Sequence, residues 1–189
     1  MEYREFLDFL ERAEKLKCNT RHSWTSSGRR ESVAEHSWRL ALMAMLLQEK
    51  FQELDMNKVI KMCLIHDLGE AVTGDIPTFE KTEKDEAVES KAVEELFWTL
   101  PERQRREMTG LFAEMNALKT REARLYKSLD KLEALIQHNE AELLTWLPLE
   151  YDLQMTYGTE ECSFDSYIEG LREVVREDSR RKISFDPAS

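Results

Sequence analysis

Residues 62–68 read Met-Cys-Leu-Ile-His-Asp-Leu, a run that is apolar on nearly every side when it is placed on a helix. A helix of this kind lies in the centre of a protein, so we predict a buried central helix that opens near Asp55 or Asn57. The run nevertheless contains His66 and Asp67. An ionised carboxylate buried without a partner costs more free energy than folding supplies. Asp67 therefore needs strong hydrogen bonds or a cation.

The rest of the chain repeats its apolar residues mostly at intervals of three and four, with only six glycines and four prolines among 189 residues. This spacing is the helical period and not that of strands. We predict an all-α helical bundle in a single domain over residues 1–189, because a chain of this length can bury one well-filled core. The helices are expected at about residues 2–16, 32–47, 55–68, 87–100, 101–117, 120–146 and 163–178. Residues 17–30 are expected to form a loop, residues 80–91 a charged surface segment, and the end of the chain a polar tail.

A divalent metal ion would satisfy both His66 and Asp67. Adjacent residues on a helix point about 100° apart, yet both reach one ion at the helix edge through bonds of ~2.0–2.2 Å. Glu70 follows Asp67 by three positions and His66 by four, so it lies on the same helix face. There it could hold or deprotonate a water molecule without being a metal ligand.

Two ligands are too few for a stable catalytic site, so others must come from other helices. His36 falls on the apolar stripe of a helix whose start is marked by a capping box between Ser32 and Glu35. A lone histidine on such a stripe is more often a hydrogen-bonded core residue. Beside a buried His-Asp pair, a metal ligand becomes the better interpretation.

Asp130 is the candidate for a fourth ligand, because it lies next to Leu129 on the apolar face of the long helix. An acid in that position is more commonly half-exposed or paired with a nearby lysine. The other two histidines, His22 and His138, lie in polar stretches and are expected to face solvent.

The chain is acidic overall, with 27 Lys plus Arg, 38 Asp plus Glu and a formal net charge of −11. This balance argues against a nucleic-acid polymer or an anionic membrane as a partner. The sequence shows neither a run of ~20 apolar residues nor a secretory signal, and its three cysteines have no CxxC spacing. We expect a cytoplasmic protein. Residues 15–30 are a local exception, with five basic residues and no acid, and could accept a small phosphate.

Three segments together resemble the HD-domain metal-dependent phosphohydrolases, in particular the bacterial 5'-deoxynucleotidases and their eukaryotic relatives. They are Ser-Val-Ala-Glu-His-Ser at residues 32–37, His-Asp-Leu-Gly-Glu-Ala-Val-Thr-Gly-Asp-Ile-Pro at 66–77 and Lys-Ser-Leu-Asp-Lys-Leu-Glu at 127–133. The resemblance covers about residues 5–147. It implies an HD-domain helical bundle that hydrolyses deoxyribonucleoside 5'-monophosphates, and a homodimer.

The same resemblance implies one divalent metal ion (Mn, Co, Zn, Fe or Mg), for which the matching ligands are His36, His66, Asp67 and Asp130. Beside the catalytic Asp67, Glu70 would orient or deprotonate the attacking water, or protonate the departing ribose oxygen.

For substrate binding, the resemblance places Asp75 against the sugar 3'-hydroxyl and Arg21 against the phosphate, which the planar guanidinium binds bidentately. The deoxynucleotidases carry tryptophan beside this arginine, whereas this chain has His22 there and Trp24 two positions later. Trp24 is therefore the candidate aromatic wall of the substrate site.

Three alternatives remain beside this interpretation. The same metal centre could hydrolyse another small phosphate, such as a guanosine tetraphosphate alarmone. A metal-stabilised regulatory module without activity is disfavoured because Glu70 and Asp75 are present. A two-iron oxygenase would need more ligands, and beyond the predicted set only His138 follows His66.

Overall fold

The computed structural model describes residues 1–185 and is almost entirely helical, as predicted. The elements are α1 (Tyr3–Ala13), a 3₁₀ helix η1 (Glu14–Lys17), β1 (Thr20–Trp24), β2 (Arg30–Ser32), α2 (Val33–Leu46), α3 (Met56–Ile65), α4 (Glu70–Thr73), α5 (Glu83–Phe97), α6 (Glu102–Ala117), α7 (Arg121–Glu140), a 3₁₀ helix η2 (Leu143–Thr145), α8 (Pro148–Thr156), α9 (Thr159–Cys162) and α10 (Ser166–Ser184). No helix in this part of the chain is long and apolar enough to cross a membrane.

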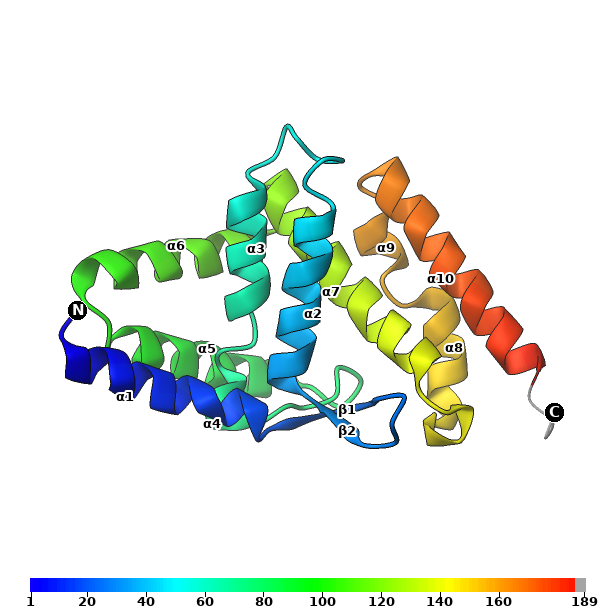
Figure 1. Cartoon of the computed structure of the whole chain (residues 1–189), viewed down its shortest axis with the longest axis horizontal. Coiled ribbons are helices and arrows are strands. Elements are labelled where there is room, and N and C mark those ends of the chain that lie inside the picture. The colour runs from blue at the N-terminus through cyan, green and yellow to red at the C-terminus, as the bar shows by residue number, and fades with distance from the viewer. Residues whose placement is uncertain (186–189) are drawn as a thin grey trace.

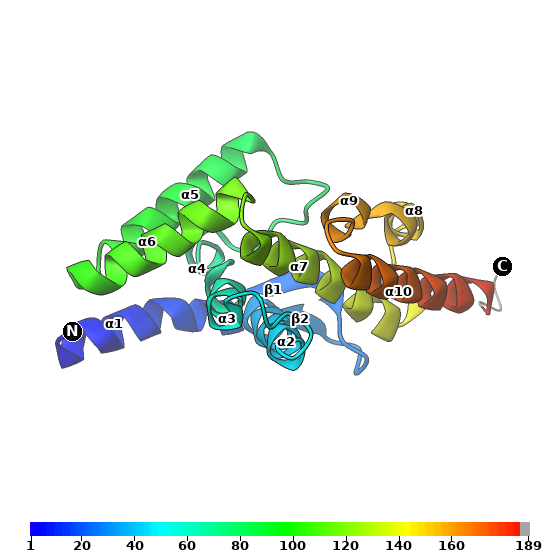
Figure 2. The same cartoon turned by 90° about the horizontal axis from the view of Figure 1, so that it is seen from above.

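The centre of the molecule consists of α2, α3 and α7, which pack against one another (Figure 1). α7 also contacts α6 and α10. It therefore joins the helices of the N-terminal half to the C-terminal helix. Its apolar face is fully buried at Leu125, Leu129 and Leu132. Figure 2 shows α5 and α6 side by side, with α1 apart from this pair. The predicted central helix is thus one of three central helices.

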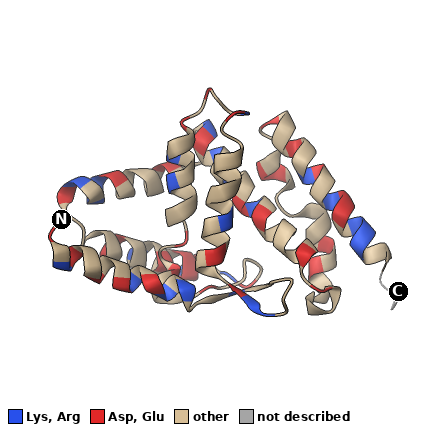
Figure 3. Cartoon of the chain, viewed as in Figure 1, with Lys and Arg blue, Asp and Glu red and all other residues tan. Residues whose placement is uncertain are grey.

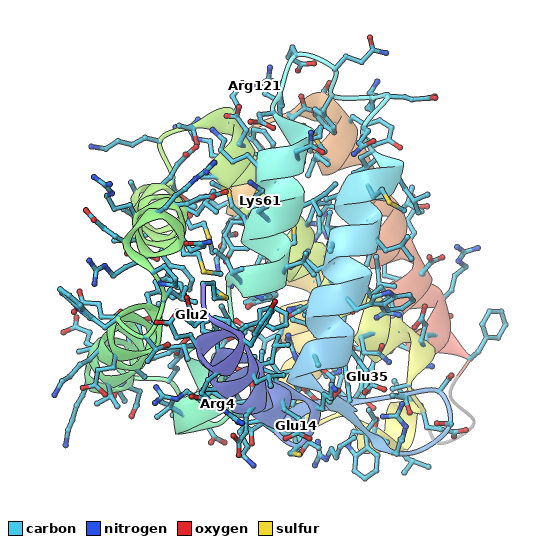
Figure 4. The ribbon with its side chains drawn as sticks, turned by 60° about the vertical axis from the view of Figure 1, so that its left-hand side comes forward. Glu2, Arg4, Glu14, Glu35, Lys61 and Arg121 are labelled. Carbon is cyan, nitrogen blue, oxygen red and sulfur yellow. The ribbon has the colours of Figure 1, made fainter. Side chains whose placement is uncertain are left out.

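The start of α2 follows the predicted capping box. The Ser32 hydroxyl accepts a hydrogen bond from the Glu35 backbone N–H at 3.2 Å, and the Glu35 carboxylate accepts one from the Ser32 N–H at 2.9 Å. Glu35, which Figure 4 labels in the first turn of α2, also forms an ion pair with Arg29, and this pair ties the hairpin loop to the helix. These contacts fix the first turn of α2, which carries His36.

The central helix is shorter than predicted, since α3 ends at Ile65. His66 and Asp67 lie in the turn that follows. Here the backbone bonds span three residues instead of four, with the Leu68 N–H donating to the Ile65 carbonyl at 3.1 Å and the Glu70 N–H donating to the Asp67 carbonyl at 3.0 Å. The tighter turn places both side chains at the end of the helix, and α4 then begins at Glu70.

Residues 17–30 are not the loop that we predicted, because they include most of an antiparallel β-hairpin. β1 and β2 pair Thr20 with Ser32 and Trp24 with Arg30. The strands are short and polar, so they lack the apolar alternation by which a strand is recognised in a sequence. Figure 3 shows acidic and basic segments mixed along the helices. Of the five basic residues in segment 15–30, the hairpin carries three, namely Arg21, Arg29 and Arg30.

Helix boundaries in the C-terminal half also differ from the predictions. α7 ends at Glu140 and not near residue 146, because Ala141 has an extended backbone. Pro148 does not end a helix but begins α8, where its fixed φ suits the first turn. The last helix is capped by Asp165 and not by Ser163.

Two segments of the N-terminal half lie at the surface. The predicted first helix is present as α1, but Phe6 and Leu10 remain 50% and 46% exposed, while Phe9 and Ala13 pack partly on the core. The charged segment 80–91 is helical from Glu83 onward, where α5 begins.

Candidate metal centre and active site

Four polar side chains from three elements converge beneath the hairpin. His36 comes from α2, His66 and Asp67 from the turn after α3, and Asp130 from α7. The Nε2 atoms of the two histidines are 3.2 Å apart. His36 Nε2 lies 3.3 Å from an Asp130 oxygen, and His66 Nε2 lies 3.0 Å from an Asp67 oxygen. The structure thus brings together all four residues predicted as metal ligands.

The outer nitrogens of both imidazoles are already engaged. His36 Nδ1 hydrogen-bonds a carboxylate oxygen of Glu133, and His66 Nδ1 lies 2.9 Å from the Cys63 carbonyl oxygen. Because carboxylates and carbonyls only accept, each Nδ1 is the donor. In the neutral rings both Nε2 atoms therefore carry lone pairs, which face each other at 3.2 Å.

Two facing lone pairs repel each other unless a proton or a cation lies between them. A metal ion with bonds of ~2.0–2.2 Å holds neighbouring ligand atoms roughly 3.0–3.5 Å apart. Three of the distances above, 3.0, 3.2 and 3.3 Å, match that spacing. Two imidazoles and two carboxylates are also a usual donor set for divalent transition metals. The residues present therefore fit a divalent metal ion.

The electrostatics of the site favour a bound cation. Burial lowers the pKa of His36, but Glu133 and Asp130 outweigh this effect and raise it to about 9. Burial by itself would raise the pKa of Asp67, and contacts with His66, His36 and Arg21 hold it well below its usual range instead. The pKa of Asp130 is also well below its usual range, because Lys127 Nζ lies 2.8 Å from it. Both predicted carboxylate ligands are therefore ionised.

Glu70 lies beside this cluster at the start of α4 and is 4% exposed. Its Oε2 atom is buried and has no hydrogen-bond partner within residues 1–185. Burial, together with the nearby charges of Asp67 and Asp75, raises its pKa to about 10. A carboxyl group that keeps its proton this readily, next to a metal site, is suited to exchanging a proton with a reacting oxygen.

Arg21 projects from β1 to the edge of the metal cluster. One of its terminal nitrogens lies 3.9 Å from an Asp67 oxygen, and its Nε lies 3.7 Å from Glu31. Burial lowers the pKa of Arg21, but the surrounding carboxylates outweigh this effect and raise it, so the side chain remains charged. The guanidinium is thus a fixed positive group whose charged neighbours are carboxylates.

Asp75 follows Gly74, which ends α4 with a φ of 76°. This left-handed conformation favours glycine, because it has no Cβ. Burial raises the pKa of Asp75, while Arg21 and a backbone hydrogen bond from His22 oppose the rise.

A pocket with a volume of about 180 Å³ opens next to the metal cluster, and Arg21 and Asp75 belong to its wall. The other lining residues are His22, Ser23, Pro77, Thr78, Phe79, Ala134, Leu135, His138, Glu150, Leu153, Gln154 and Tyr157. Trp24, the predicted aromatic wall, is not among them. Its ring lies against the guanidinium of Arg30 at 4.3 Å, and its backbone carbonyl accepts a hydrogen bond from Gln137.

His22 and His138 do not face solvent, contrary to the sequence prediction. Their side chains are only 18% and 15% exposed, and both contact the buried carboxylate of Glu150. Burial lowers the pKa of His138. The sequence held one signal for this position, because Asp130, Ala134 and His138 recur every four residues along one flank of α7. The position of Glu150 could not be anticipated, since α8 itself was not predicted.

Comparisons with known proteins identify the family of this chain. The family model described as HD domain matches residues 13–172. A protein of Dictyostelium discoideum named 5'-deoxynucleotidase HDDC2 is 37% identical over 147 residues, which cover 72% of this chain and 77% of the relative. The human protein of the same name is 32% identical over 149 residues, covering 77% and 72%. A crystal structure from Magnetospirillum magnetotacticum, described as a predicted metal-dependent phosphohydrolase, superposes with a TM-score of 0.80 at 30% identity and covers 97% of this chain and 98% of its own.

Proposed function

The chain belongs to the HD-domain family, and we propose that it hydrolyses deoxyribonucleoside 5'-monophosphates to a deoxynucleoside and phosphate. One observation carries the proposal. A divalent-metal site, an unpartnered buried carboxyl group on Glu70 and the fixed cation of Arg21 lie together, and Arg21 also lines the adjoining pocket. The relatives named 5'-deoxynucleotidase support the choice of substrate.

In this proposal His36, His66, Asp67 and Asp130 hold one divalent metal ion. When bound, the ion polarises the phosphate and lowers the pKa of an attacking water. Mixed nitrogen and oxygen donors suit Mn, Fe, Co or Zn better than Mg, which prefers oxygen ligands alone. The hydrogen bonds of the two Nδ1 atoms keep both rings oriented with Nε2 toward the ion.

Arg21 binds the non-bridging phosphate oxygens and holds the phosphate against the metal site. Its pairing with buried carboxylates fixes the side chain before substrate arrives, so little conformational entropy is lost on binding. Its permanent charge offsets part of the repulsion between an anionic substrate and the acidic cluster.

Glu70 exchanges the proton that the reaction moves. Attack of water on phosphorus releases one proton, and departure of the 5'-oxygen of the sugar requires one. A carboxyl group whose pKa is raised to about 10 by its surroundings is a proton donor at neutral pH, and neutralisation of the nearby carboxylates by a cation brings that pKa down toward the range of a base. Glu70 can therefore take a proton from the water and pass it to the sugar oxygen.

Asp75 faces the pocket next to Arg21, where the sugar of a bound nucleotide must lie. Its carboxylate accepts a hydrogen bond from the 3'-hydroxyl in this proposal, which positions the ring and favours 2'-deoxyribose. Replacing Asp75 by asparagine should reduce the preference for deoxyribonucleotides over ribonucleotides. An unchanged preference would assign sugar discrimination to other residues.

Phosphate release tests the proposal directly. The purified protein is incubated with deoxyribonucleoside and ribonucleoside 5'-monophosphates, a guanosine tetraphosphate alarmone and simple phosphate esters, with Mn, Co, Zn, Fe or Mg supplied in turn. We expect the highest kcat/KM with deoxyribonucleotides. A higher kcat/KM with the alarmone or a simple ester would replace the proposed substrate, and no release under any condition would reject hydrolysis.

The proposal extends to the state of the protein in the cell, where we infer a cytoplasmic homodimer from the family resemblance. α1 offers surface for such an assembly, because Tyr3, Phe6, Leu7 and Leu10 are each at least 46% exposed. Sedimentation equilibrium of the purified protein measures the oligomeric state.

A further inference from the structure

The second histidine cluster, formed by His22, His138 and Glu150, lies in the wall of the pocket beside the metal site. Glu150 is 3% exposed, and one of its oxygens accepts a hydrogen bond from the Leu147 N–H at 2.6 Å. Its other oxygen lies 2.9 Å from His22 Nε2 and 3.4 Å from His138 Nε2. The metal site proposed above uses none of these three residues.

These three residues are not arranged as a second metal site. Three groups of described residues bring their potential ligand atoms within 4.8 Å of one another, and this cluster is not one of them. An anion is also disfavoured, because Glu150 accepts a hydrogen bond through one oxygen and meets two imidazoles through the other, as an ionised carboxylate does. The cluster is therefore suited to a neutral polar group.

One atom of the cluster is left without a partner. His22 Nε2 is buried and lies close to Glu150, but it is not aligned for a hydrogen bond with any described residue. Leaving a buried polar atom without a hydrogen bond costs free energy, unless a ligand or a water molecule provides the partner. The rings of Phe79 and His22 pack edge to face with 5.6 Å between their centres, and Leu135 and Leu153 line the same pocket. The wall thus combines apolar surface with ring nitrogens.

The volume of the pocket restricts what can fill it. About 180 Å³ is below the ~300–1,000 Å³ of pockets that enclose whole drug-sized ligands. A complete nucleotide does not fit, but one planar heterocycle does. Arg21 and Asp75 line the same pocket and connect it to the metal site. The metal site with Arg21, then Asp75, and then the histidine cluster therefore follow the order of phosphate, sugar and base in a 5'-nucleotide.

We propose that His22 and His138, held by Glu150, form the subsite that binds the nucleobase of the deoxynucleotide and sets the preference among bases. The inference rests on the proposed nucleotide hydrolysis, which it deepens. The imidazole nitrogens hydrogen-bond the polar edge of the base, while Phe79 and Leu153 contact its faces. Glu150 touches no substrate atom in this arrangement and acts as a positioning residue for both rings.

The test compares substrates with and without a base. KM and kcat are measured for the four deoxynucleoside 5'-monophosphates and for 2-deoxyribose 5-phosphate, in the wild type, His138→Ala and Glu150→Gln. The ratio of KM for the preferred nucleotide to KM for 2-deoxyribose 5-phosphate should rise about tenfold in His138→Ala, as expected when roughly one hydrogen bond to the base is lost. Glu150→Gln should raise it less, and the order of preference among the bases should change in both variants.

Glu142→Gln is the matched control, because it makes the same substitution at an exposed carboxylate just after α7. Its KM ratio should equal that of the wild type. Equal fold increases of KM for both kinds of substrate in His138→Ala would mean a structural role, and wild-type KM values for both would mean that the base binds elsewhere. Either result overturns the inference. Should His138→Ala fail to fold, as judged by circular dichroism, His138→Gln replaces it.

A second measurement separates this inference from the proposed function. Calorimetry measures the binding of free deoxynucleosides, which contain the base but no phosphate, and therefore does not depend on hydrolysis. Affinity should fall about tenfold in His138→Ala and stay the same in Glu142→Gln. If the wild type releases no phosphate from any nucleotide but binds deoxynucleosides through His138, only the proposed reaction fails. If it hydrolyses nucleotides and this affinity does not change, only the base subsite fails.

Discussion

The protein contains two pairs of histidines, one buried and one partly buried, and they differ in where their Nε2 atoms lie. In the pair His36 and His66, both Nδ1 atoms donate hydrogen bonds outward and both Nε2 atoms converge at 3.2 Å. In the pair His22 and His138, both Nε2 atoms lie near the single carboxylate of Glu150 instead of near each other. The first arrangement brings two lone pairs together for a cation, and the second does not. Burial of a histidine pair is therefore not sufficient for a metal site.

The electrostatic surroundings also favour a cation at the first pair and not at the second. Burial lowers the pKa of His36, yet Glu133 and Asp130 outweigh it and raise this pKa to about 9. For His138, burial outweighs the attraction of Glu150, and its pKa falls below the ordinary value. A negative potential that attracts a proton also attracts a metal ion. The number of carboxylates around each pair thus separates a cation site from a site for a neutral group.

The largest expected effect comes from removing one imidazole of the first pair. His66→Ala should lose bound metal and reduce kcat by about 10⁴-fold or more, because a metal ion contributes several kcal/mol to transition-state stabilisation. His138→Ala, the matching change in the second pair, should keep its metal. Metal analysis of both purified variants measures the difference. Stoichiometric metal in His66→Ala would remove the proposed four-ligand site.

Glu70→Gln should lower kcat by about 10²–10⁴-fold, the usual effect of losing a general acid or base. Metal content should stay at the wild-type level, since Glu70 is not a proposed ligand. This variant therefore separates proton transfer at the first histidine pair from metal binding there. A wild-type rate in fully metal-loaded Glu70→Gln would contradict its role.

Glu133→Gln should weaken metal binding by about 10–100-fold, because Glu133 holds the Nδ1–H of His36 and thereby orients the ring. Glu150→Gln makes the same substitution at the second pair and should leave metal affinity unchanged. Competition with a chelator measures both affinities. If both variants bound metal equally well, the hydrogen bond to Nδ1 would not distinguish the two pairs.

The smallest expected effect is on stability against pH in the metal-free protein. The folded-state pKa of His36 is raised above its unfolded value of 6.5, so its contribution is complete below pH 6.5 and is lost as the pH rises through about 9. The raised pKa values of Glu31, about 7, and Glu70, about 10, act in the same direction.

We therefore expect Tm of the metal-free protein to fall by several degrees between pH 6.5 and pH 9, since about 1 kcal/mol moves Tm of a chain of this size by roughly 2–4 °C. The fall should be smaller in the metal-loaded protein, where His36 holds the ion in place of a proton. Calorimetric scans at both pH values, with and without metal, provide the measurement. A constant or rising Tm in the metal-free protein would contradict the assigned pKa of His36.

Much of the helical framework could be predicted from local sequence. The capping residues Ser32 and Thr120 mark the starts of α2 and α7, and Asp55 marks that of α3, because caps and apolar periodicity act within a few residues. The turn at His66 was missed. The apolar pattern of α3 continues to Leu68, so the sequence shows no sign that the helix ends at Ile65.

Only part of the candidate site could likewise be predicted from local sequence. The four predicted metal ligands could be found from the sequence because each is a polar residue on or beside an apolar helix face, and the family resemblance then joined them in one metal site. His22 and His138 could not be placed, since the polar residues around them suggest solvent. The hairpin and α8, neither of which has a clear local signal, enclose them in the pocket.

By itself, the sequence determined the helical class, the starts of the three central helices and the residues suited to a metal ion. These properties follow from spacing and chemistry within short segments. Only the tertiary structure decided which nitrogen of each histidine is free and which carboxylate it meets. Glu133 and Glu150 reach their histidines from distant parts of the chain, and such contacts form only when the helices pack together.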